Sequence, residues 1–111
     1  MYIDGEGGEQ DSHQAARWLL LAAKKGQIDA QVRLGELLVT GDGIKASPVH
    51  GLMWLTVALK RAQTLGYDDR WIREKHEAAF SLAGEPVRRR AMEMADQWIA
   101  NNSDLVSVAA Q

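Results

Sequence analysis

A repeat with a period of 36 residues is the feature of this sequence that most restricts its fold. Displaced by this interval, a tryptophan-leucine pair, an alanine and a glycine turn each fall on a second copy: Trp18-Leu19 on Trp54-Leu55, Ala22 on Ala58, and Gly5-x-Gly7 on Gly41-x-Gly43. Repeats of this length are typical of stacked helical hairpins, none of which can bury its apolar face alone. We therefore predict an α-α superhelix, which offers extended surfaces to other proteins and does not by itself assemble a catalytic centre.

The composition fits one small domain and excludes several classes of partner. The 111 residues are 46% hydrophobic, with 13 basic against 15 acidic side chains and a net charge of −2, so nucleic acid is not an expected partner. The absence of cysteine removes thiol nucleophiles and cysteine-ligated zinc. The acidic first residues do not resemble a secretory signal, and no apolar run is long enough to span a bilayer.

Five helices are predicted from apolar spacing and from helix-end residues. They cover about 11–25, 29–40, 47 to 62 or 65, 68 to 84 and 86–101, with Asp11, Asp29 and Ser47 as N-caps and Gly26 as a left-handed terminator. Residues 1–101 are predicted to form the solenoid. Within it, residues 8–66 hold the repeats, and 67–101 form a capping helix pair locked by Trp71 and Trp98. Residues 102–111 are predicted to follow as a flexible tail.

Two sets of residues are predicted to shape the hairpins. The first packs the repeats together: Trp18, Leu19, Ala22, Ala30, Leu34, Gly35, Leu38, Trp54, Leu55 and Ala58. The second supplies turns in which glycine takes up a positive φ: Gly5, Gly7, Gly41 and Gly43. Gly35 lies inside a predicted helix, where glycine costs about 1 kcal/mol relative to alanine, so we expect close approach of a neighbouring helix there.

These residues together resemble the SEL-one-like repeat, a variant of the tetratricopeptide hairpin. The likeness covers about residues 2–62 and rests on Ala30-x-x-x-Leu34-Gly35-x-x-Leu38, Gly41-Asp-Gly43-Ile44, the cap at Ser47, and Gly51-x-x-Trp54-Leu55-x-x-Ala58. Departures are mild: Leu38 stands for a tyrosine, Ser47 for an aspartate and Gly51 for an alanine. The resemblance implies a non-enzymatic protein-interaction module.

Residues 47–99 are also similar to the C-terminal end of ExoR-type bacterial regulators. The resemblance implies restraint of a membrane sensor kinase that controls exopolysaccharide synthesis. It places the protein in the periplasm if the chain derives from a longer precursor, and otherwise in the cytoplasm. The alternatives are a generic adaptor in a membrane-associated complex and, more remotely, a small hydrolase. Because the opening helix lacks a preceding partner, we also expect truncation, or self-association through this end.

No residue pattern identifies a catalytic, metal or cofactor site. His76-Glu77 begins the motif H-E-x-x-H, but position 80 is Phe, so a helical surface pair is favoured over zinc binding. Asp68-Asp69 is interpreted as helix capping, and the run at 88–90 as a salt-bridged face. The glycine turns lack the lysine of a phosphate loop. We predict no cofactor and no enzymatic activity.

One surface is a candidate for binding another protein. Val32, Glu36 and Val39 lie opposite the Leu34 and Leu38 stripe of their helix, at steps of four and three residues. In tetratricopeptide-like solenoids such positions often line a concave groove. The two valines are expected to contact either a bound segment or only the neighbouring helix.

Overall fold

The computed structural model describes residues 9–41 and 44–102, with side chains from residue 13 onward. This part of the chain holds five α-helices and no strand: α1 (Glu9–Lys24), α2 (Ile28–Thr40), α3 (Pro48–Leu65), α4 (Arg70–Leu82) and α5 (Glu85–Asn101). The predicted all-α class and the order of five helices are confirmed. Four helix starts differ from the prediction by one or two residues: α4 begins at Arg70 and not at 68, and α5 begins at Glu85 and not at 86. The predicted N-caps Asp11 and Asp29 lie inside their helices and are not caps. The first helix already includes Glu9, and α2 begins at Ile28, which leaves Asp29 in its first turn, where a carboxylate complements the helix dipole.

Glycines end the first three helices in the left-handed conformation. Gly26 has φ 95°, Gly41 has φ 72° and Gly66 has φ 76°. The backbone N–H of Gly41 donates to the Leu37 carbonyl, which satisfies one of the carbonyls left open at the end of α2. The predicted roles of Gly26 and Gly41 are therefore confirmed, whereas Gly66 was not predicted. Gly5, Gly7 and Gly43 lie outside the described residues.

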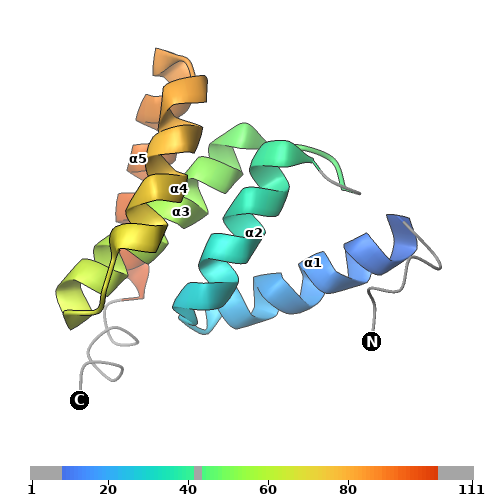
Figure 1. Cartoon of the computed structure of the whole chain (residues 1–111), viewed down its shortest axis with the longest axis horizontal. Helices are drawn as coiled ribbons and strands as arrows, with labels where there is room; N and C mark the ends of the chain where they lie inside the picture. The colour runs from blue at the N-terminus through green and yellow to red at the C-terminus, as the bar shows by residue number, and fades with distance from the viewer. Residues whose placement is uncertain (1–8, 42–43, 103–111) are drawn as a thin grey trace.

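The centre of the fold is the pair formed by α2 and α3. Gly35 and Gly51 face each other there: a Cβ added to Gly35 would lie 2.9 Å from the Gly51 carbonyl oxygen, and one added to Gly51 would lie 2.8 Å from that of Gly35. The close approach expected at Gly35 is thus confirmed. Helix α3 also packs against α4 and α5, and its residues 51–58 are all buried. Helix α1 packs against α2 and projects away from α4 and α5 (Figure 1).

The repeat residues do not all meet the same surroundings. The core holds Ala30, Leu34, Trp54, Leu55 and Ala58, and partly buried residues against it include Leu19, Ala22 and Leu38. Trp18 is the exception and corrects our prediction. It is 64% exposed, whereas its counterpart Trp54 is 4% exposed. The reason is the neighbouring helix: the Trp98 ring of α5 meets the Trp54 ring edge-on at 5.5 Å, and α1 has no such cover.

The two C-terminal helices are joined through α3. Both pack against it, and Trp98 contacts Trp54, whereas Trp71 is 39% exposed. The expected Trp71–Trp98 lock is therefore replaced by separate contacts. A direct link between α4 and α5 comes from Arg88, whose Nε donates to the Phe80 carbonyl at 2.7 Å and whose guanidinium lies 4.5 Å from the centre of the Phe80 ring.

Candidate functional site

A groove opens between α1 and α3, with α2 as its floor. We call it the α1–α3 groove. It has a volume of about 410 Å³ and is lined by His13, Ala16, Arg17, Leu20, Leu34, Leu38, Ile44, Lys45, Ser47, His50 and Trp54. Its walls are mostly apolar, and Leu20 is among the large apolar side chains that remain exposed. Among the described residues, these apolar side chains remain available for contact.

The charged and titratable groups of the α1–α3 groove are all basic or imidazole. They are His13 and Arg17 on α1, Lys45 on the approach to α3, and His50 in the first turn of α3. No Asp or Glu is among the described residues that line the groove. His50 is held in place because its Nδ1 lies 2.7 Å from the Ser47 Oγ. An apolar segment with acidic neighbours is the complement of such a surface.

The α1–α3 groove exists because the helical stack is uneven. Helix α5 packs directly on α3, whereas α1 packs on α2 and leaves space beside α3. This surface was not predicted from the sequence, although Leu34, Leu38 and Trp54 were predicted to be packing residues. The available signal was the helical spacing of His13, Ala16, Arg17 and Leu20, at steps of three, one and three, which puts them on one face of α1.

The candidate binding residues Val32, Glu36 and Val39 do not form an open surface. Val32 is fully buried, and a Cβ added to Gly51 would lie 2.6 Å from the Val39 Cγ2, so both valines pack within the chain. This packing corrects the alternative in which Val32 contacts a bound segment. Glu36 is partly exposed, and its Oε2 accepts from the Lys75 Nζ at 2.9 Å. Such a half-exposed ion pair contributes little to stability.

His76 is half-buried on α4, against α3, whereas Glu77 is exposed. Its Nε2 lies 3.0 Å from the Oγ1 of buried Thr56, and its ring stacks on Phe80. Burial lowers the pKa of His76 below its ordinary value, an effect that Glu77 opposes. Among the described residues, no three His, Asp, Glu or Cys side chains gather in a group that could hold a metal ion.

The remaining charged motifs have structural roles. Asp68 Oδ1 accepts from the backbone N–H of Arg70 at 3.1 Å, which fits the predicted capping of α4. Hydrogen bonds from Gln63 and Arg73 lower the pKa of Asp69. In the predicted salt-bridged face, Arg89 pairs with Glu85 at 2.9 Å, whereas Arg88 instead bonds the end of α4. Within the described ranges, no helix is both long and apolar enough to cross a membrane.

Comparisons with known proteins agree with this architecture. The Sel1 repeat matches residues 1–27 and 28–61. The chain is 34% identical over 104 residues to an exopolysaccharide production negative regulator of Rhizobium meliloti (strain 1021). It is 35% identical over 104 residues to the protein of the same name from Rhizobium leguminosarum bv. viciae. These alignments cover 94% of this chain but only 37% and 36% of the relatives. No solved structure matches the chain.

Proposed function

Because the chain belongs to the Sel1 repeat family, we propose that it is a non-enzymatic regulator that binds a segment of another protein in the α1–α3 groove. The observation that carries this proposal is an apolar groove in which the titratable side chains among the described residues are all basic or imidazole. The occupant we assign is an amphipathic segment with apolar anchors and flanking Asp or Glu residues. Its apolar side chains would rest on Leu20, Leu38 and Ile44, which are partly or largely exposed, and its carboxylates would face Arg17 and Lys45.

The regulated process that we propose is exopolysaccharide synthesis. The two relatives from Rhizobium are named as its negative regulators, and this chain aligns with about a third of their length. The likeness to ExoR-type proteins supports a signalling partner, which we propose to be a sensor kinase held in check by the bound regulator. In this scheme the basic groups select the partner and the buried apolar area supplies most of the affinity.

A gene replacement in the bacterium that carries this chain tests the proposal. The double variant Arg17→Glu and Lys45→Glu reverses two charges of the groove without touching the core, since both residues are exposed. We expect exopolysaccharide output to rise toward that of a strain lacking the gene, at unchanged protein abundance on immunoblots. The matched control is Arg89→Glu and Arg90→Glu, which makes the same change in charge on the exposed face of α5.

The outcomes separate the alternatives. Output that rises for the groove variant and not for the control supports the regulator. An adaptor role is favoured if the groove variant loses a binding partner and if deletion of the gene leaves exopolysaccharide output unchanged. If the two double variants changed exopolysaccharide output equally, the groove would be overturned as the binding surface. Reversing charge elsewhere on the surface would then have the same effect as reversing it in the groove.

A further inference from the structure

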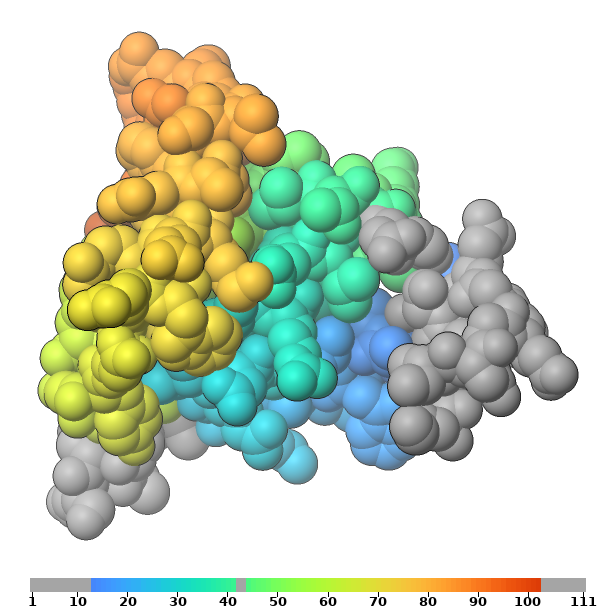
Figure 2. All heavy atoms as spheres, in the orientation of Figure 1, coloured from blue at the N-terminus to red at the C-terminus, as the bar shows by residue number. Residues whose placement is uncertain are grey.

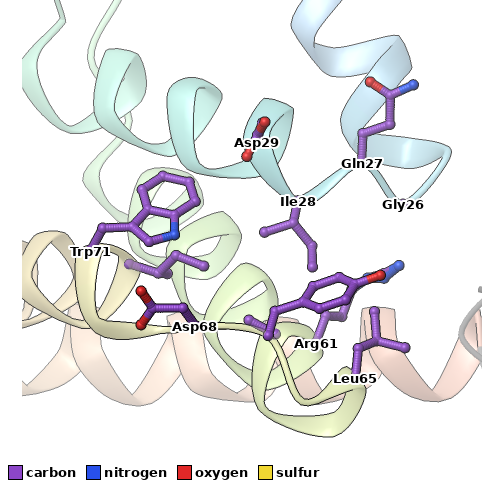
Figure 3. Close-up of a pocket in the computed structure, with 11 residues that line it drawn as sticks. Gly26, Gln27, Ile28, Asp29, Arg61, Leu65, Asp68 and Trp71 are labelled. Atoms are coloured by element: carbon purple, nitrogen blue, oxygen red, sulfur yellow. The ribbon is translucent and has the colours of Figure 1, made fainter. Parts of the chain in front are cut away.

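A second cavity lies on the other side of the fold, where α2 begins and α3 ends. It has a volume of about 520 Å³, and its lining includes Ile28, Asp29, Arg61, Leu65, Asp68 and Trp71. Figure 3 shows Asp68 and Trp71 on the α4 side and Arg61 on α3, with Ile28 between them in this view. Figure 2 shows the start of α2 beside the segment that runs from the end of α3 into α4, and these elements border the cavity.

Arg61 is the unusual group of this cavity. It is 3% exposed, yet among the described residues neither its Nε nor its Nη1 has a hydrogen-bond partner. A buried guanidinium without acceptors is costly, and the same burial lowers the pKa of Arg61. The adjacent start of α2 adds positive potential, because its N-cap Gln27 makes no side-chain capping bond and leaves the first backbone N–H groups open. The Arg61 guanidinium therefore lacks an acceptor for Nε and Nη1 among the described residues.

The remaining walls of the cavity are acidic or apolar, and this restricts the class of ligand that fits it. Asp29 and Asp68 contribute carboxylates, so a free inorganic anion would meet two negative charges for one guanidinium. Asp68 uses one oxygen to cap α4, which leaves the other available. Ile28, Leu65 and Trp71 add apolar surface, and the Trp71 ring offers a face to a cation. A molecule that carries both charges and an apolar group matches all of these walls.

We propose that this cavity binds a small zwitterion with an apolar side chain, that is, a free amino acid or a short peptide. The carboxylate pairs with the guanidinium of Arg61, the one cation among the described residues that line the cavity. The ammonium group faces Asp68. The apolar side chain rests on Ile28, Leu65 and Trp71. This site is separate from the α1–α3 groove, and the proposal does not depend on the identity of the partner protein.

Titration calorimetry on the unmodified chain tests the ligand class with four probes: L-leucine, leucyl-leucine, N-acetyl-leucine and leucine amide. We expect one or both zwitterions to bind, with at least about tenfold loss for each blocked form, since each lacks one of the two charges. Tighter binding of leucine identifies the amino acid as the source, and tighter binding of leucyl-leucine identifies the peptide. Equal affinity for N-acetyl-leucine, or no heat from either zwitterion at about 10 mM, would overturn the proposal.

Two variants link binding to the guanidinium. Arg61→Met removes the buried charge at similar length, and we expect it to lose zwitterion binding while its melting temperature stays the same or rises. Lys60→Met is the matched control, because Lys60 is the neighbouring cation and pairs instead with Asp96 at 2.6 Å. It should bind the zwitterion normally. Retained affinity in Arg61→Met would contradict the proposal, and the four probes on the unmodified chain decide the question if that variant fails to fold.

Discussion

Replacing Gly51 with alanine probes the packing of α3 on α2. A Cβ at this position would lie 2.6 Å from the Val39 Cγ2, 2.8 Å from the Gly35 carbonyl oxygen and 2.9 Å from the Val39 backbone nitrogen. Two of these three atoms belong to the backbone of α2 and cannot rotate away as a side chain can. The two helices would therefore have to move apart by about half an ångström, with loss of contacts along their length.

The expected effect on stability is the difference between two opposing contributions. Alanine gains about 1 kcal/mol over glycine through helix propensity. Overpacking of a core costs about 1–3 kcal/mol, and contact with backbone on the facing helix puts Gly51→Ala near the upper value. We expect a net loss of about 2 kcal/mol in the free energy of unfolding, or a fall of roughly 10 °C in melting temperature for a domain of this size.

Urea unfolding followed by circular dichroism measures this loss. Ala78→Gly calibrates it, because Ala78 is exposed inside α4 and its replacement reports helix propensity alone, about 1 kcal/mol. Adding Val39→Ala to Gly51→Ala should recover only part of the stability, since it removes the side-chain contact and leaves the backbone contacts. Stabilisation by Gly51→Ala of the size that Ala78→Gly loses would refute the close packing of α2 and α3.

Two further predictions concern His76 and the tryptophans. Burial lowers the pKa of His76 below 6.5, so the unfolded chain binds its proton more readily. The stability that neutral His76 contributes is complete above about pH 6.5 and is lost as the pH falls through the lower pKa of the folded chain. Melting temperatures measured from about pH 5 to 7 should therefore fall with decreasing pH. The variant His76→Gln should remove this dependence on pH, and His13→Gln should leave it unchanged. Trp98→Ala should lower the free energy of unfolding in urea by about 2–4 kcal/mol, because it uncovers Trp54. Trp18→Ala should change this free energy by no more than about 0.5 kcal/mol, because Trp18 is 64% exposed. Equal losses for the two variants would contradict the different surroundings of the two repeats.

The sequence predicted those features that local pattern determines. Apolar spacing and terminal glycines gave the five helices, and a glycine inside a helix indicated the close approach at Gly35. The difference between Trp18 and Trp54 could not be predicted in this way, because the two residues occupy the same repeat position and only the helices packed beside them differ.

The candidate sites depend on tertiary geometry that periodicity does not contain. Arg61 follows Lys60 near the end of α3 and has the pattern of a solvated helix end, yet it is buried where the end of α3 meets the start of α2 and of α4. The α1–α3 groove likewise results from the direction in which α1 leaves α2. Val32 is a further example, because a helix at the centre of a stack is buried on two faces. Only a narrow stripe of α2 then faces solvent, formed by Asp29, Arg33, Glu36 and Thr40.

Selection of peptides from a random display library by the purified chain is the most direct test of the α1–α3 groove. The account predicts that enriched peptides carry apolar residues at helical or alternate spacing, flanked by Asp or Glu. Their affinity should fall at least about tenfold for the Arg17→Glu and Lys45→Glu variant and remain for Arg89→Glu and Arg90→Glu. Enrichment of basic or uncharged peptides, or affinity that survives the reversal of Arg17 and Lys45, would contradict it.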